Sequence, residues 1–172
     1  MVVDHQGKKL ERCDTGVDGI RKLLQQLKTP SAPGPDGVHP IVLKECAHSL
    51  AKPLSIIFQK SMESGQLPKD WTRANVIPIY KKGSHSDALN YRPVSLTSVP
   101  SKILEKLIRA KVMEHLEQSN FLNHHQHGFR SKRSCLTQLF EFLFDLENTL
   151  DEAECADALF LDCCRAFDTV VK

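Results

Sequence analysis

A carboxylate at the end of an apolar segment is the first candidate for chemistry in this sequence. Residues 156–161 (Ala-Asp-Ala-Leu-Phe-Leu) are mainly apolar, and Asp162 follows them directly. This pattern predicts a buried β-strand that delivers a carboxylate to its C-terminal edge. A carboxylate in that position can bind a divalent cation or cap the N-terminus of a following helix, and the pattern alone leaves both roles open. A second carboxylate, Asp168, lies six residues further on.

Positive charge is concentrated in the middle of the chain. Residues 71–133 contain 11 Lys or Arg and four acids, whereas residues 134–172 contain two Lys or Arg and nine acids. A basic segment next to an acidic one fits a polyanion that meets metal-binding carboxylates, although solvated helix faces produce the same division. The candidate cations are Lys81, Lys82, Arg92, Arg130, Lys132 and Arg133.

Helical spacing and turn residues predict the elements of the first part of the chain. Apolar residues recur at helical spacing over residues 17–27, 41–50 and 54–62. Between the first two of these helices, residues 30–40 contain four prolines and two glycines, which predicts a turn-rich loop.

A β-hairpin is predicted next. Residues 74–80 are rich in β-branched side chains, residues 91–96 can return beside them, and a basic Lys-Lys-Gly-Ser loop follows the first strand. Pro78 indicates an edge position, because proline has no N–H to donate to a neighbouring strand. The hairpin would carry Lys81, Lys82 and Arg92 near its tip and on its strands.

Two longer helices are predicted after the hairpin, over residues 101–118 and 134–150. Each has one apolar face, and we expect both faces to be buried. In the second helix the residues expected in the core are Leu136, Leu139, Phe140, Leu143, Phe144 and either Leu146 or Leu150.

The composition is that of an ordinary soluble globular protein. The chain has 172 residues, of which 41% are hydrophobic and 26% charged, and its formal net charge is +2. The charged N-terminal residues lack the apolar core of a secretory signal, and no apolar segment approaches the ~20 residues that span a bilayer. We therefore expect a soluble intracellular protein of the cytoplasm or nucleus with no membrane partner.

Cysteine and histidine do not predict a disulfide framework or a zinc site. The six cysteines form no Cys-x-x-Cys pair, so we expect reduced thiols. His124, His125 and His127 have no cysteine or acid at ligand spacing.

Five short motifs, in this order and at fitting intervals, resemble those of reverse transcriptases of non-LTR retrotransposons. They are Gly34-Pro-Asp-Gly37, Ala74-x-Val-Ile-Pro-Ile-x-Lys-Lys-Gly83, Asn90-Tyr-Arg-Pro-Val-Ser-Leu96, Gln126-x-Gly-Phe-Arg130 with Ser134, and Phe160-Leu-Asp-x-x-x-Ala-Phe-Asp168. The resemblance spans residues 17–171 and implies an α+β fold, in which helical fingers with a small antiparallel sheet join the first strand of a palm. It divides the chain into a flexible tail (1–16), the fingers (17–100), and the fingers–palm connection with an incomplete palm (101–172).

The resemblance also implies roles at the catalytic centre. Asp162 matches the first catalytic carboxylate of the palm, and the backbone carbonyl of Cys163 would be its companion ligand for Mg²⁺, of which the complete enzyme uses two ions. Phe167 matches a bulky residue that resembles a steric gate against a ribose 2′-hydroxyl, with simple core packing as the alternative.

Cations on the fingers have implied roles as well. Lys82, together with Lys81, and Arg92 match the residues that bind the triphosphate of the incoming dNTP, although a Lys-Lys-Gly turn can also be plain solvated surface. Three further cations could contact template phosphates, which basic residues do without reading the sequence; these are Arg130, Lys132 and Arg133. Phe129, beside them, is expected in the core.

The implied activity is RNA-directed DNA polymerisation, in which dNTPs are added to a DNA primer on an RNA template. Cys163, Cys164 and Arg165 depart from the usual family residues, and the sequence contains neither an Asp-Asp pair nor a Pro-Gln-Gly motif. We therefore expect the chain to need the missing remainder of the polymerase and to be inactive alone. The alternatives are a basic nucleic-acid-binding module without chemistry and an inert transposon remnant.

Overall fold

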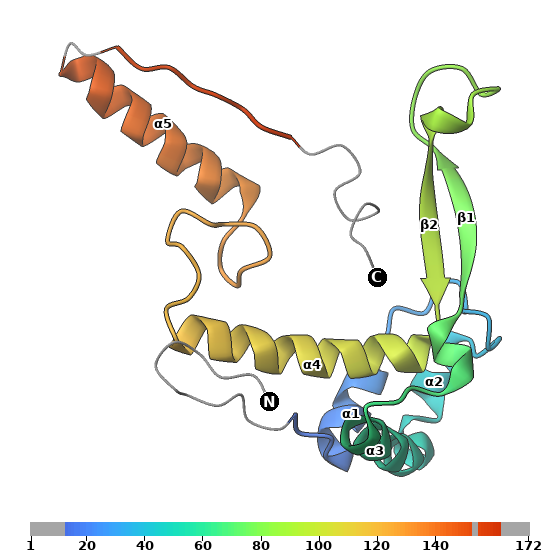
Figure 1. Ribbon diagram of the computed structural model, residues 1–172. Coiled ribbons are helices and arrows are strands. Elements are labelled where there is room, and N and C mark those ends of the chain that lie inside the picture. The colour runs from blue at the N-terminus through green and yellow to red at the C-terminus, as the bar shows by residue number, and fades with distance from the viewer. Residues whose placement is uncertain (1–12, 153–154, 163–172) are drawn as a thin grey trace. The chain divides into compact units, whose positions relative to one another are not determined.

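The computed structural model describes residues 13–152 and 155–162, and the chain divides into two compact units between Phe121 and Leu122. The described part of the first unit contains four α-helices and a β-hairpin (Figure 1). Its elements are α1 (Val17–Gln25), α2 (Pro40–Glu45), α3 (Ala47–Ser64), β1 (Ala74–Tyr80), β2 (Tyr91–Thr97) and α4 (Val99–Gln118), with 3-10 turns at Lys69–Thr72 and Ala88–Asn90. The described part of the second unit contains α5 (Cys135–Asp151).

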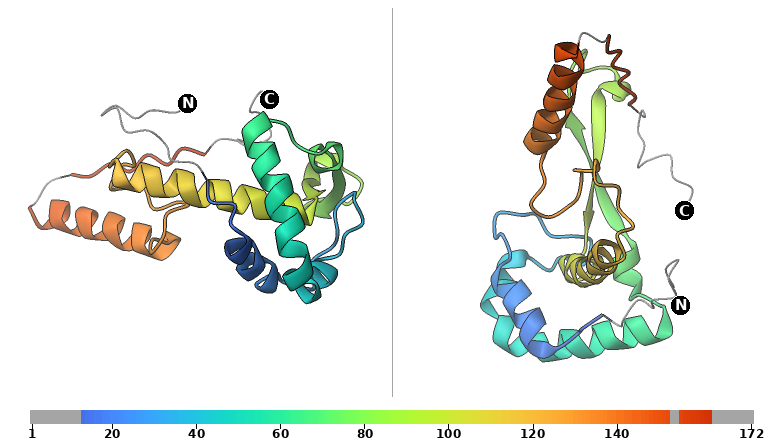
Figure 2. Two further views of the ribbon diagram at one scale, coloured as in Figure 1. Left: turned by 90° about the horizontal axis from the view of Figure 1, so that it is seen from below. Right: turned by 90° about the vertical axis from the view of Figure 1, so that its left-hand side faces the viewer.

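The core of the first unit lies between its helices. Figure 2 shows α1, α2 and α3 on one side of α4, and the apolar faces of all four helices meet there. At its centre Phe58 is fully buried, and the ring of Trp71 packs edge-on against it at 5.7 Å between centroids. The buried apolar residues are Ile20, Leu24, Leu43, Ala47, Ala51, Leu54, Phe58, Val99, Ile103 and Leu104.

The predicted hairpin is confirmed. β1 and β2 pair antiparallel from Ala74 opposite Thr97 to Tyr80 opposite Tyr91, and they extend away from the helices (Figure 1). Pro78 lies directly opposite Pro93. Because proline has no N–H, such a pair fits only where the N–H groups point away from the partner strand, so the two prolines specify this register.

The outcome confirms the predicted fold class, a mixed α and β structure with a small antiparallel sheet. Both hairpin strands and the helices predicted over residues 17–27, 101–118 and 134–150 form close to their expected bounds. The helices predicted over 41–50 and 54–62 are divided differently, because α2 ends at Glu45 and α3 runs from Ala47 to Ser64 without a break. The third strand, predicted over residues 156–161, does not form, since residues 155–162 have neither helix nor strand hydrogen bonding.

Candidate functional site

The three hairpin cations lie on one exposed element. Lys81 and Lys82 follow β1 directly, and Arg92 is the second residue of β2, opposite Ile79. All three side chains are exposed, and none forms an ion pair or hydrogen bond with another residue that the structure describes. They are therefore available to an external anion.

Strand geometry places Lys81 on the same face as Arg92. Directly opposite residues share a face and successive residues alternate, so Lys81 continues the face of Ile79 and Arg92. The N–H of Lys81 donates to the carbonyl of Asn90 at 2.8 Å, which extends the pairing one step beyond the strands. Lys82 lies in the connecting loop rather than on β1. A ligand on this face can therefore contact both Lys81 and Arg92.

Hydrogen bonds from both strand ends hold the loop between β1 and β2. Three side chains donate to loop carbonyl oxygens, namely Tyr80 to Gly83 (2.6 Å), Asn90 to Ser84 (2.9 Å) and Tyr91 to His85 (2.9 Å). Gly83 has φ +92°, and a Cβ there would lie 2.5 Å from the Asn90 amide nitrogen. Both facts require glycine at position 83, which links the Lys-Lys-Gly motif to the Asn-Tyr-Arg-Pro motif.

Two tyrosine rings lie next to these cations in the sequence. They were not identified as part of the site from the sequence alone. Tyr80 stacks on His85 with 3.9 Å between ring centroids and meets Tyr91 edge-on at 5.7 Å. Because successive strand residues alternate, Tyr80 and Tyr91 lie on the opposite face from Lys81 and Arg92. Aromatic rings on a surface can stack on the bases of single-stranded nucleic acid. The only sequence signal was the recurrence of Tyr next to Lys81 and Arg92, which strand propensity explained equally well.

The turn at residues 34–37 contacts the base of the hairpin. The hydroxyl of Ser98 donates to Asp36 Oδ2 at 2.7 Å, and Ser98 is fully buried. A Cβ on Gly34 would lie 2.6 Å from backbone atoms of Thr97 and Ser98. The proline-rich segment is thus a packed turn, a role that its composition did not reveal.

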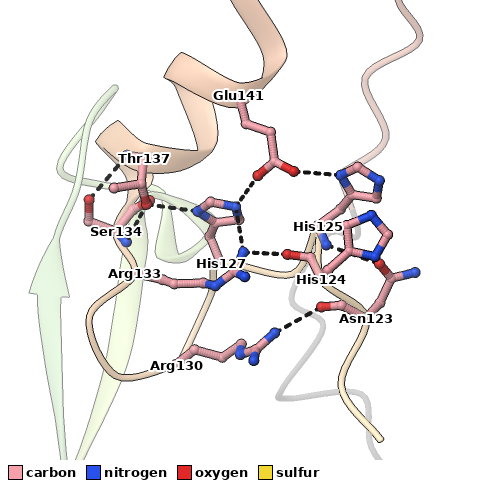
Figure 3. A network of polar contacts seen from close by, with 9 residues as sticks. All are labelled: Asn123, His124, His125, His127, Arg130, Arg133, Ser134, Thr137 and Glu141. Atoms are coloured by element: carbon pink, nitrogen blue, oxygen red, sulfur yellow. Dashed lines mark hydrogen bonds and ion pairs between the residues drawn. The ribbon is translucent and has the colours of Figure 1, made fainter. Parts of the chain in front are cut away.

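In the second unit, a network of hydrogen bonds joins the loop before α5 to the helix itself (Figure 3). Glu141 on α5 accepts from His125 Nδ1 at 2.7 Å and from His127 Nε2, and His127 Nδ1 lies 2.7 Å from the hydroxyl of Thr137. That hydroxyl also donates to the carbonyl of Ser134, and Arg133 Nη1 lies 2.9 Å from His127 Nε2. The hydrogen bond from His127 is the main cause that lowers the pKa of Glu141, and that from His125 adds to it.

Glu141 lies 14 residues after His127, so spacing alone did not predict an acid beside the histidines. Ser134 begins α5 with a capping box, in which Ser134 and Thr137 exchange side-chain to backbone hydrogen bonds. The cap fixes the first helical turn and so brings Glu141 over the loop.

The predicted template-binding cations are placed differently from one another. Arg130 donates to the carbonyl of Asn123 at 3.0 Å, and Arg133 donates to the carbonyl of His124 (Figure 3). Both guanidinium groups therefore stabilise the loop before α5 through hydrogen bonds to its backbone. Lys132 is exposed and has φ +60°.

Phe129 was predicted to be a core residue, and the structure contradicts this. Its side chain is 73% exposed and its φ is +62°. The left-handed backbone of the turn directs the ring outward.

Burial of the apolar face of α5 was also predicted incorrectly. The helix forms, but its face is exposed, with Phe140 and Phe144 each at 63%. No residue of α5 is buried. Within the described residues of the second unit no surface covers this face, so the periodicity predicted the helix but not its partner.

Asp162 is exposed and makes no ion pair or hydrogen bond with another described residue. The expected buried strand before it is absent, since Leu159, Phe160 and Leu161 are more than 80% exposed. A strand needs a neighbour for its hydrogen bonds, and the described residues provide none here. Cys163 and Phe167 lie outside the described residues.

A metal site is not complete within the part of the chain that the structure describes. No three side chains of His, Cys, Asp or Glu come together there in a way that could hold a metal ion. Asp162 would supply one carboxylate, and Mg²⁺ is commonly held by one or two protein carboxylates together with water and substrate phosphates. Among the described helices, none is both long and apolar enough to cross a membrane.

Comparison with known proteins agrees with the motifs. Residues 79–171 match the family model described as reverse transcriptase (RNA-dependent DNA polymerase). The chain is 30% identical over 155 residues to a probable RNA-directed DNA polymerase from transposon BS of Drosophila melanogaster, and 28% identical over 155 residues to the RNA-directed DNA polymerase from mobile element jockey of the same species. Each match covers 90% of this chain and 17% of the relative, so the chain spans about a sixth of these proteins.

Proposed function

Because this chain belongs to the reverse transcriptase (RNA-dependent DNA polymerase) family, we propose that its hairpin binds the triphosphate of an incoming dNTP in a non-LTR RNA-directed DNA polymerase. The family acts on a nucleic-acid template and primer with dNTP substrates and uses a divalent metal. One observation carries the proposal, which is that Lys81, Lys82 and Arg92 stand on a single hairpin without a partner among the described residues.

The chemistry of the three cations suits this ligand. The planar guanidinium of Arg92 can donate two parallel hydrogen bonds to phosphate oxygens, whereas each lysine acts as a point charge. The hydrogen-bonded loop that carries Lys82 loses little conformational entropy when the ligand arrives, because Tyr80 and Tyr91 already fix its backbone.

Asp162 is proposed as the first catalytic carboxylate. The metal in the family would be Mg²⁺, which lowers the barrier by activating the primer hydroxyl and stabilising the leaving pyrophosphate. Since the described residues do not complete a metal site, no reaction step is assigned to them. The part proposed for this chain is to present Asp162 and to neutralise the triphosphate.

Nucleotide binding can be tested with the isotope-labelled chain. We expect dTTP to shift backbone amide NMR signals of residues 79–92, and Arg92→Ala to weaken binding about tenfold, as loss of a charge-assisted contact requires. Lys60→Ala is the control, because Lys60 is an exposed cation on α3, away from the hairpin strands. Equal weakening by both variants, or shifts spread over the helices, would overturn the proposal.

A second candidate function is nucleic-acid binding without chemistry, and the Tyr80–His85 stack favours it. In the same experiment a single-stranded uridine oligonucleotide replaces dTTP. If the oligonucleotide shifts the hairpin signals and dTTP does not, the second candidate is correct and the first is wrong.

We expect no primer extension by this chain alone. The assay uses an RNA template with Mg²⁺ or Mn²⁺, beside an Asp162→Ala control. Templated extension that the control abolishes would show that the chain completes a two-metal site, contrary to this expectation.

A further inference from the structure

We propose that the turn at residues 34–37 clamps the base of the hairpin, and that Asp36 is a positioning residue for Arg92. This inference rests on the proposed function for its consequence, because Arg92 is the residue assigned to the triphosphate. The clamp itself is a statement about geometry and can be tested without any nucleotide.

The first observation is a hydrogen bond between distant parts of the sequence. Ser98, which separates β2 from α4, donates through its hydroxyl to Asp36 Oδ2 at 2.7 Å. Serine at the start of a helix normally uses this oxygen to accept from the helix backbone, but Ser98 makes no such capping bond. Its fully buried hydroxyl is committed to Asp36 instead.

The second observation is a close backbone approach beside that hydrogen bond. A Cβ at position 34 would lie 2.6 Å from the nitrogen of Ser98 and from the carbonyl carbon and oxygen of Thr97. These are backbone atoms that cannot rotate away, so only glycine allows the contact. The N–H of Gly37 donates to the carbonyl of Gly34 at 3.1 Å, and Gly37 has φ +67°, which closes the turn. Asp36 also accepts from the N–H of Val38 at 3.2 Å, so its carboxylate is fixed on both oxygens.

The third observation explains why the base decides the hairpin's direction. Every residue of β1 is exposed, so among the described residues of its unit no surface packs along that strand. On the other side of Ser98, Val99 and Ile103 anchor α4 in the core. The junction between β2 and α4 is therefore one place where the hairpin meets a rigid support. Trp71, which packs on Phe58 just before β1, is another.

A small change at this junction is magnified at Arg92. Arg92 precedes Ser98 by six residues, which is about 20 Å of strand at ~3.3 Å per residue. A tilt of about 5° at the base would move Arg92 by roughly 2 Å, and misplacement by ~1 Å can cost a catalytic interaction about a hundredfold. The clamp thus supplies the angular precision that a triphosphate contact needs.

The test measures the hairpin's direction in the full chain. Spin labels are attached at Lys60→Cys on α3 and Leu89→Cys in the hairpin loop, in a background without the native cysteines, and their distance distribution is recorded. We expect Asp36→Ala and Ser98→Ala each to broaden the distribution or shift its mean by several ångströms, and the double variant to do no more than either. Asp18→Ala is the matched control, since it removes an exposed carboxylate and its hydrogen bond to Arg21 on α1.

Asp36→Ala can also unfold the unit, so circular dichroism accompanies each measurement and Ser98→Ala, the smaller change, is the second variant. Unchanged distributions in a folded Ser98→Ala protein would overturn the clamp. A shifted distribution with unchanged dTTP affinity would overturn the positioning role, whereas a shift together with at least threefold weaker binding supports it. If the parent chain binds no dTTP, the proposed function fails by itself, and the distance result still decides the clamp.

Discussion

Helices α3 and α5 have similar apolar periodicity and opposite environments. On α3, Ala51, Leu54 and Phe58 are buried among the helices of the first unit, and α3 continues past Pro53 without a break. On α5, Phe140 and Phe144 are more than half exposed. Periodicity therefore specifies a helix and its apolar face, but a partner surface elsewhere decides whether that face is buried.

The apolar face of α5 is not buried, and local interactions hold the helix instead. Its capping box and the hydrogen bonds that Glu141 accepts from two histidines lie within 20 residues of one another. The first unit instead depends on contacts between residues far apart in the chain, such as Asp36 with Ser98. The two units should accordingly respond differently to substitution.

The largest expected difference between the two helices is in the free energy of unfolding that is lost when a phenylalanine is replaced by alanine. Phe58→Ala should destabilise the first unit by about 3–5 kcal/mol, because it removes a fully buried ring and leaves a cavity beside Trp71. Urea unfolding followed by circular dichroism measures this.

Phe144→Ala on α5 is the matched control for that substitution. The ring is 63% exposed, and we expect a change below about 0.5 kcal/mol. A cost similar to that of Phe58→Ala would mean that α5 is buried in solution and that the contrast between the helices is wrong.

A second difference concerns glycine within the first unit. Gly34→Ala should cost about 1–3 kcal/mol, since the new Cβ meets backbone atoms at 2.6 Å. Gly19→Ala on α1 should have the opposite sign and stabilise by roughly 0.5–1 kcal/mol, because nothing lies within 4 Å of that Cβ and alanine favours the helix. Thermal unfolding of both variants decides the matter, and equal signs would contradict the close approach at position 34.

Much of the fold follows from local pattern. The helices and the hairpin were predicted because apolar spacing, Pro78 and the turn glycines act over a few residues. The hairpin cations were found in the same way, since the strand and loop that carry them are local features. Gly83 illustrates the limit, because the need for glycine arises from Asn90 on the returning strand.

Features that depend on a distant partner were not predicted. The contact of Asp36 with Ser98 joins residues 62 apart, and a proline-rich composition gives no sign of it. Phe129 was assigned to the core rather than to a stacking platform, but its ring is exposed on a turn residue with a positive φ. The strand expected before Asp162 failed for a related reason, because a strand cannot form without a neighbour to bond.

The network around Glu141 should depend on pH. Because hydrogen bonds from the histidines lower the pKa of Glu141, its stabilising effect is fully present above the unfolded value of about 4.3 and is lost as the pH falls through the lower folded value. We expect the amide-exchange protection factors of residues 123–133 to fall over that acidic range.

Glu141→Gln should remove this dependence and leave the protection factors of these amides low at every pH between about 3 and 6. Glu147→Gln, which changes another exposed acid on α5, should behave like the parent chain. Retention of the acid transition in Glu141→Gln would assign it to a different carboxylate.

The smallest expected effect on stability is at Lys132, where one substitution should change stability little but weaken RNA binding. Its φ of +60° is costly for a side chain with a Cβ, so Lys132→Gly should leave stability unchanged or raise it by at most about 1 kcal/mol. If the exposed ammonium contacts a template phosphate, the same substitution should weaken binding of single-stranded RNA and reduce the slope of log affinity against log salt by about one. Lys132→Arg keeps the charge and should keep the slope. Replacing Arg133, which already donates to the carbonyl of His124, should change the stability of the loop more than it changes the slope. Fluorescence anisotropy over a salt series measures both variants, and an unchanged slope in Lys132→Gly would remove this lysine from the nucleic-acid interface.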